Sequence, residues 1–156
     1  LPKLPALPAS HGHAETSPTE TYAQVARGAT TCWFGAGGQL KQSHVFHADA
    51  EPPSSGGKAE IALHERDASA QALRGAKVYR IALSSDGSGT QIEHTNHKLP
   101  DPLAAAIQSD VHRFARGNFT CATAGPTAPK AEPAAEPPAT AKGKANTRPR
   151  PAARNG

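Results

Sequence analysis

Several features common in proteins are missing from this sequence of 156 residues. It contains no Met and only 4% aromatic residues, so aliphatic side chains and Ala must supply most of a core. No apolar run approaches the roughly 18 residues that a membrane-spanning helix needs. The sequence therefore predicts one small domain without a membrane-spanning helix.

Signatures of catalysis are also missing. The glycine-rich segments at 35–38 and 86–89 are short turns, and neither matches a phosphate-binding loop or a dinucleotide fingerprint. Asp110 and His112 lie two positions apart on an expected helix, where they face different directions and cannot form a catalytic dyad. No Gly-x-Ser-x-Gly motif is present. We therefore expect a protein that is not an enzyme and that uses no cofactor.

Cysteine is limited to two residues, Cys32 and Cys121, which mark the two edges of the expected folded region. We predict a disulfide between them, because a bond that closes so long a loop stabilises a small domain by roughly 4–5 kcal/mol in the chain-entropy model. The alternative is a cytosolic protein with two reduced, buried cysteines.

A disulfide favours an oxidising compartment, so we expect a periplasmic or secreted protein. The missing initiator Met fits removal of a signal segment, although a trimmed sequence would look the same. This expectation includes a protein that is anchored in the outer membrane through the removed N-terminal segment.

Composition divides the chain into three segments. Residues 1–16 repeat Leu-Pro and are expected to form a disordered, Pro-rich tether in extended geometry. Residues 17–123 carry helix and strand patterns and are expected to form the disulfide-linked α+β domain. Residues 124–156 are rich in Pro, Ala and cations and cannot bury enough apolar surface to fold, so we expect a disordered basic tail.

Two helices are expected at the ends of the domain. Ser17 as N-cap, with Pro and Glu in the first turn, predicts a helix that stops at Gly28. A second helix is expected from Asp101, its N-cap, to Gly117. Its apolar stripe comprises Leu103, Ile107, Val111 and Phe114.

Between the helices, alternation of apolar and polar residues predicts strands joined by glycine-rich turns. These four strands are expected at 39–47, 59–64, 79–83 and 90–95. One face of the resulting sheet must receive the amphipathic second helix. The expected fold is therefore α+β: a helix, a four-stranded antiparallel meander, and a second helix packed on one sheet face.

Eight histidines raise the alternative of a zinc- or copper-binding protein. Three close pairs occur, at positions 11 and 13, 44 and 47, and 94 and 97. Residues three apart on a strand point to opposite faces, so the last two pairs are poorly placed to chelate an ion. The first pair lies in the expected tether. We therefore assign no metal ligand and keep metal binding as an alternative function.

Positive charge is concentrated in the expected tail. From residue 126 onward six cations face two carboxylates, which gives +4, the formal net charge of the whole chain. Such a tail can engage an anionic polymer or a membrane surface, or it can serve only as a solubilising linker. The absence of aromatic residues for base stacking argues against nucleic acid. The candidate contact residues are Lys142, Lys144, Arg148, Arg150 and Arg154.

Trp33 and Phe34 follow Cys32 and are candidates for a protein-binding hot spot, because aromatic anchors dominate many interfaces. The alternative places both side chains in the core, since the chain has few aromatic residues to fill one.

The segments TTCWFGAGGQLKQSHVFHA and DVHRFARGNFTC carry a resemblance to a known family. They resemble small exported or lipoprotein-like envelope proteins of rhizobial-type alphaproteobacteria, and the resemblance spans 17–121. It implies a periplasmic address and no activity. We therefore expect a non-enzymatic accessory or binding protein of the bacterial envelope, whose domain docks on an envelope protein while its tail contacts an anionic surface.

Overall fold

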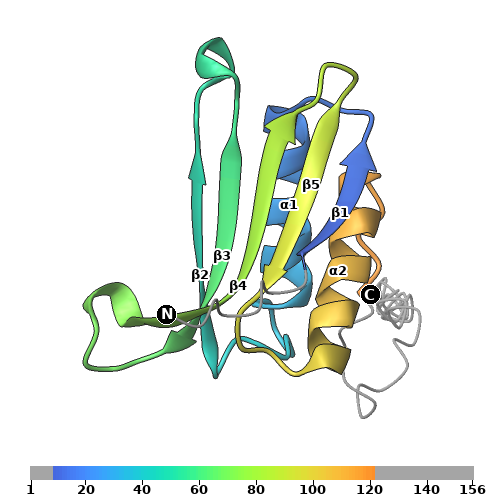
Figure 1. The fold of residues 1–156 in the computed structure, drawn as a ribbon. Helices are drawn as coiled ribbons and strands as arrows, with labels where there is room; N and C mark the ends of the chain where they lie inside the picture. The colour runs from blue at the N-terminus through green and yellow to red at the C-terminus, as the bar shows by residue number, and fades with distance from the viewer. Residues whose placement is uncertain (1–8, 122–156) are drawn as a thin grey trace, which may run out of the picture. The chain divides into compact units, whose positions relative to one another are not determined.

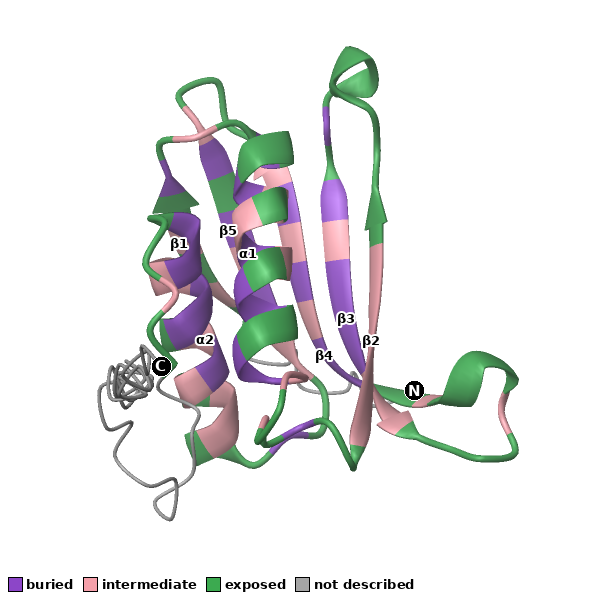
Figure 2. Ribbon diagram, turned by 180° about the vertical axis from the view of Figure 1, so that it is seen from behind, coloured by how far each residue is buried: buried purple, intermediate pink, exposed green. Residues whose placement is uncertain are grey.

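Regular secondary structure fills most of residues 9–121, which are the residues that the computed structural model describes. Residues 1–8 and 122–156, which include the expected tail, lie outside them. The elements are β1 (Ala9–Ala14), α1 (Pro18–Cys32), β2 (His44–Ala50), β3 (Ala59–Arg66), β4 (Arg74–Ser85), β5 (Thr90–Asn96) and α2 (Asp101–Ala115). The strands form one antiparallel sheet in the order β1-β5-β4-β3-β2, and both helices cover the same face of it (Figures 1 and 2). The α+β class is confirmed.

The first helix, α1, begins as predicted and ends later than predicted. The Ser17 hydroxyl accepts a hydrogen bond from the backbone N–H of Glu20 at 3.3 Å, which is the expected N-cap. The helix then continues through Gly28 to Cys32. Gly28 is a point of close packing and not a stop, since a Cβ placed on it would lie 2.2 Å from Cγ of Phe114. The benefit of this contact outweighs the roughly 1 kcal/mol that an internal glycine costs a helix.

Strand β1 was missed, because we assigned residues 1–16 to a tether. Ala9–Ala14 instead pair with β5 in antiparallel register, with Gly12 opposite Ile92. The segment gives little strand signal because its only buried residue is Ala14 and it contains no large apolar side chain. The sheet therefore has five strands among the described residues, where the sequence predicted four.

Strand β2 begins later than expected, at His44 instead of residue 39. The preceding residues form turns in which Leu40 is buried and its backbone N–H donates to the carbonyl of Trp33 at 3.1 Å. This contact folds the chain back beneath the end of α1, so the apolar residue that suggested a strand serves a turn instead.

The second helix, α2, follows its predicted pattern closely. Ile107, Val111 and Phe114 are fully buried, and Leu103 is partly buried and packs against the core, which confirms the apolar stripe. Pro100 takes the N-cap position that we assigned to Asp101, and Gly117 follows the helix with a φ of +77°, a conformation that favours glycine. The stripe therefore packs on the sheet and on α1, and the core lies between the helices and the sheet.

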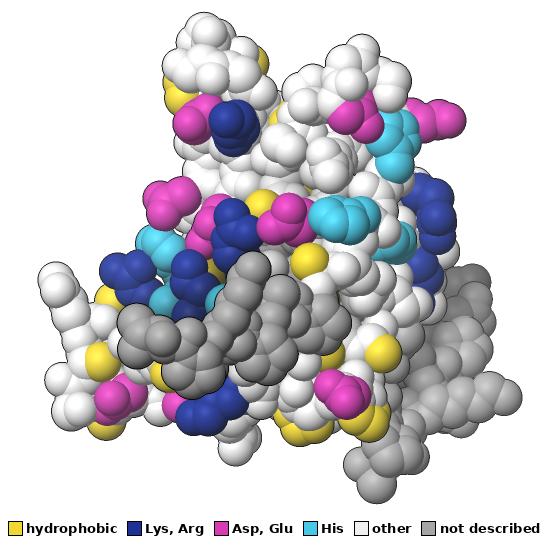
Figure 3. Space-filling view, in the orientation of Figure 1, with side chains coloured by type: hydrophobic (Ala, Val, Ile, Leu, Met, Phe, Trp, Pro, Cys, Tyr) yellow, Lys and Arg dark blue, Asp and Glu magenta, His cyan; other side chains and the backbone are white. Residues whose placement is uncertain are grey.

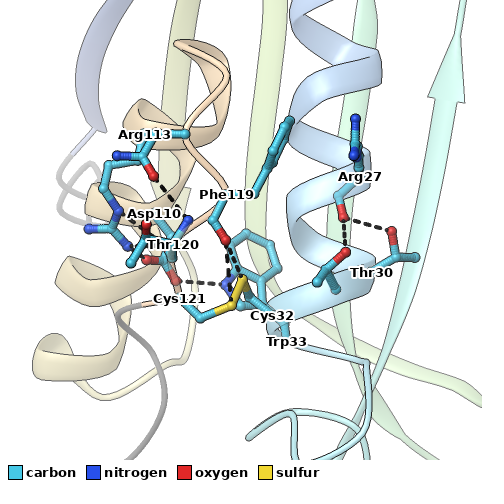
Figure 4. Close-up of a disulfide and its surroundings, with 11 residues drawn as sticks. Arg27, Thr30, Cys32, Trp33, Asp110, Arg113, Phe119, Thr120 and Cys121 are labelled. Atoms are coloured by element: carbon cyan, nitrogen blue, oxygen red, sulfur yellow. Dashed lines mark hydrogen bonds and ion pairs between the residues drawn. A yellow bond between two sulfur atoms is a disulfide. The ribbon is translucent and has the colours of Figure 1, made fainter. Parts of the chain in front are cut away.

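The predicted disulfide between Cys32 and Cys121 is confirmed, and it uses both cysteines of the chain. It joins the last residue of α1 to the segment after α2 (Figure 4). The next strand in the chain, β2, begins twelve residues after Cys32. The bond thus fastens the two helices together at one end of the helical layer.

No helix within residues 9–121 combines the length and the apolar character that crossing a membrane requires.

Candidate functional site

The face of the sheet without helices is polar and carries a network of charged side chains (Figure 3). At its centre Arg80 of β4 donates from Nε to Glu60 of β3 at 2.8 Å and from Nη1 to Glu93 of β5 at 3.1 Å. Lys77 donates to the other oxygen of Glu60 at 2.8 Å. Strand pairing places these residues side by side, so three adjacent strands hold one ordered ion-pair network.

The ion pairs change the acid strength of the groups in this network. Hydrogen bonds from Lys77 and then Arg80 hold the pKa of Glu60 below its ordinary value, against the opposing effect of burial. The hydrogen bond to Glu60 is the main reason that the pKa of Arg80 is raised. Glu60 and Arg80 therefore stay charged near neutral pH and present a fixed pattern of charge to solvent.

A shallow hollow of about 550 Å³ lies beside this network, over β2 to β5. Ala82 and Ser84 contribute to its lining, and its charged residues are more acidic than basic. The charged lining residues are Asp49, Glu51, Glu60, Glu93, Lys58 and Arg80. The hollow can therefore receive a group that donates hydrogen bonds or carries positive charge.

A second feature is a chain of buried polar side chains between the sheet and α2. The hydroxyl of Tyr79 and Nδ1 of His94 share a hydrogen bond at 3.0 Å, and Nε2 of His94 lies 3.2 Å from Nε2 of His112 on α2. Tyr79 and His94 are each only 2% exposed. The chain leads from the core of the sheet to the half-buried ring of His112.

Burial controls the proton affinity of this chain. It is the largest cause that lowers the pKa of His94, to about 4, and the positive charges of His112 and His11 add to the effect. Burial, followed by the charge of Arg116, also lowers the pKa of His112. Burial raises the pKa of Tyr79. Both imidazoles are therefore neutral at pH 7. In each neutral ring one nitrogen carries a hydrogen, and the other has a lone pair that can accept a hydrogen bond.

Acidification is expected to destabilise the metal-free protein through His94. Because its folded-state pKa of about 4 is below the ordinary value of 6.5, the unfolded chain binds a proton between these values that the folded chain does not. The contribution of neutral His94 to the free energy of unfolding is complete above pH 6.5. It is lost as the pH falls toward 4, by up to about 3 kcal/mol. Urea unfolding at pH 7 and pH 4.5, with a chelator present, measures it.

A matched pair of variants assigns this pH dependence. His94→Asn removes the titrating group and is expected to flatten the slope between pH 6.5 and 4.5. His97→Asn changes an exposed histidine just beyond the same strand and is expected to keep the slope. The same slope in His94→Asn and the parent protein would show that other groups cause it.

Trp33 lies in the core and is not available at the surface as a hot spot. Its side chain is fully buried, its ring packs 5.8 Å from that of Phe114, and its Nε1–H donates to Asp110 at 2.9 Å (Figure 4). Phe34 is half-buried and packs against Phe46 at 6.0 Å. The position of Trp33 agrees with the alternative that its side chain fills the core. Only the exposed part of Phe34 can contact a partner.

Asp110 is fully buried and accepts hydrogen bonds from both Trp33 and Arg113. Arg113 in turn donates from two of its nitrogens to the carbonyl of Thr120, next to Cys121. This network orders the segment that carries the disulfide. Asp110 and His112 do face different directions, as their spacing predicted: one points to Trp33 and the other to His94.

The histidine pairs of the sequence are distributed over both faces of the sheet. His11 and His13 share the helix-free face of β1, where His13 lies 3.1 Å from Asp86. His94 points to α2, whereas His97 is exposed beyond β5. Within the described residues no group of three or more His, Cys, Asp or Glu side chains is placed to hold a metal ion.

Sequence reasoning missed the contact between His94 and His112. The alternation that predicts Ile92 on the buried face of β5 also places His94 there, and this signal was readable. The position of His112 opposite it depends on how α2 crosses the sheet, which no local pattern encodes. The candidate tail residues Lys142, Lys144, Arg148, Arg150 and Arg154 lie outside the described residues.

No family model, curated protein or solved structure matches this chain.

Proposed function

We propose that this chain is a non-enzymatic binding or accessory protein of the bacterial envelope that holds a partner protein on the helix-free face of its sheet. The observation that carries the proposal is the placement of both helices on one face. The opposite face is left with an ordered charge network and a hollow beside it. Preorganised charges on an open sheet favour recognition, because little side-chain freedom is lost when a partner binds.

The chemistry of the face indicates the kind of partner. Four carboxylates and two cations line the hollow, so a partner that presents basic or hydrogen-bond-donating side chains fits it best. Arg80 is satisfied by Glu60 and Glu93, and the carboxylate of Asp49 already lies 2.9 Å from Nε2 of His47. Among the lining carboxylates, Glu51 is therefore the one that we propose attracts such a partner.

Two further parts of the proposal concern location and the tail. The extracytoplasmic location rests on the disulfide, because disulfides persist in oxidising compartments. The tail is proposed to contact an anionic polymer or membrane surface through its basic residues, each of which contributes about 1 kcal/mol near a charged membrane.

Site-specific photo-crosslinking tests the binding face. A photoreactive residue at Ala82, in the lining of the hollow, is expected to give a discrete adduct in cells of the native host. The same residue at Ala23, an exposed position on α1, is expected to give none. Adducts are detected by denaturing electrophoresis and identified by mass spectrometry.

A charge variant extends this test. Adding Glu51→Gln to the Ala82 crosslinking protein removes the charge of one lining carboxylate. It is expected to reduce the adduct at least about fivefold, the effect of losing one contact worth about 1 kcal/mol. Adducts from Ala23 alone would place the partner on the helical face and contradict the proposal. Equal adducts with and without the Glu51 charge would show that this carboxylate does not contribute to recognition.

A further inference from the structure

Two imidazole nitrogens converge from different elements at the boundary between the sheet and α2. His94 extends from β5, and its Nε2 atom lies 3.2 Å from Nε2 of His112 on α2. The two rings are nearly parallel, with 25° between their planes and 5.3 Å between their centroids. The residues are 18 positions apart in sequence, so only the fold brings them together.

We propose that His94 and His112 bind a divalent transition-metal ion, zinc or copper(II), through their Nε2 atoms. Two nitrogens that each lie about 2.0–2.1 Å from one tetrahedral ion are separated by about 3.3 Å. The separation of 3.2 Å between these nitrogens fits that geometry. Imidazole is a preferred ligand for both ions.

The surroundings of the pair hold both rings in position. The Tyr79 hydroxyl contacts Nδ1 of His94 at 3.0 Å, the type of outer contact that orients a ligating histidine. Gly12 of β1 lies against the ring of His112, since a Cβ there would be 2.4 Å from Cε1. Only a glycine allows this close approach, so β1 fixes the ring from the side.

The protonation of the pair also suits an ion. A neutral histidine binds a metal ion through the lone pair of the ring nitrogen that carries no hydrogen. In the metal-free protein one Nε2 carries a hydrogen that it donates to the other. With an ion bound, both hydrogens must sit on Nδ1, and His94 then donates to the Tyr79 oxygen.

One member of the pair is partly accessible to solvent, since His112 is half-buried. Two surface hollows flank the pair: one of about 200 Å³ is lined by Tyr79 and His94, and the other is lined by His112 and Arg116. Both hollows include Ala105 and Gln108. Two protein ligands leave the remaining coordination positions to water or to a ligand from a partner, and Arg116 favours an anionic one.

Calorimetric titration of zinc and copper(II) into chelator-stripped, untagged full-length protein tests the proposal. We expect uptake of one ion per chain at micromolar concentrations. His112→Ala, at a half-buried position, is expected to weaken zinc binding at least about tenfold. Two control variants, His97→Ala and His13→Ala, are expected to leave zinc binding unchanged. Thermal unfolding of each variant checks that it is folded.

Nitrogen-15 NMR of the imidazole rings identifies the ligands directly. Zinc is expected to shift the Nε2 resonances of His94 and His112 and to place the His94 hydrogen on Nδ1. No uptake at micromolar concentrations, or unchanged affinity in His112→Ala, would overturn the proposal. Shifts confined to His11 and His13, or to other histidines of the chain, would also overturn it by locating the ion elsewhere.

Discussion

Replacing both cysteines with serine is expected to lower the free energy of unfolding by about 4–5 kcal/mol, because the bond closes a long loop in the unfolded chain. The two cysteines are 89 positions apart. For a domain of this size, such a loss is comparable to the total stability of many native proteins, about 5–15 kcal/mol. Urea unfolding of the parent protein and of the double variant Cys32→Ser with Cys121→Ser measures the difference.

Reduction of the parent protein is the control for the serine hydroxyls. Oxidised and reduced parent protein have the same side chains, so the difference between them isolates the bond itself. We expect it to match the loss in the serine variant to within about 1 kcal/mol. A loss below about 1 kcal/mol in both comparisons would show that local contacts hold the ends without the bond.

Such local contacts are present around Cys121. The guanidinium of Arg27 lies 4.6 Å above the ring of Phe119, and Arg113 bonds the carbonyl of Thr120 (Figure 4). A cation above an aromatic ring contributes about 0.5–1 kcal/mol at exposed sites. These contacts order the segment but are too weak to replace the covalent bond.

The substitution Gly28→Ala is expected to destabilise the parent protein and to stabilise a protein that lacks the ring of Phe114. In the parent, the added Cβ would lie 2.2 Å from Cγ of Phe114, and overpacking of this kind costs about 1–3 kcal/mol. Phe114→Ala alone is expected to cost about 3–5 kcal/mol, since the ring is fully buried. In that background the new methyl group has room, and alanine is favoured over glycine in a helix by about 1 kcal/mol.

Four proteins form a double-mutant cycle that tests whether the effect of Gly28→Ala on stability changes sign. Chemical unfolding of the parent, both single variants and the double variant gives the effect of Gly28→Ala in each background. Ala23→Gly, at an exposed position of α1, calibrates the helix preference in the same element. An effect of the same sign and size in both backgrounds would mean that the two residues do not oppose each other.

Local signals in the sequence were sufficient for most of the fold. Ser17 caps α1, and the period of the apolar residues locates α2, because capping and helical periodicity depend only on neighbours along the chain. Strands β3 to β5 alternate apolar and polar residues for the same reason. The position of both cysteines at the edges of this pattern was enough to predict their bond.

What could not be predicted depends on contacts between distant residues. Strand β1 is specified by pairing with β5, and Gly28 continues a helix because Phe114 needs the space. In the candidate sites, Glu60, Arg80 and Glu93 meet only through strand register, and His94 meets His112 only through the packing of α2. These positions look ordinary in the sequence because the partner that gives each its role is far along the chain.

The strand order β1-β5-β4-β3-β2 has a consequence for how the protein is made. Strands β2 to β5 can pair with their neighbours as consecutive hairpins, whereas β1 leaves the ribosome early and has no partner until β5 has been synthesised. Until then β1 is unpaired, and the edges of an unpaired strand can pair with other chains. β1 therefore completes the sheet last, although it is its first strand in sequence. A chaperone that delays pairing until the whole chain is available would favour the correct sheet.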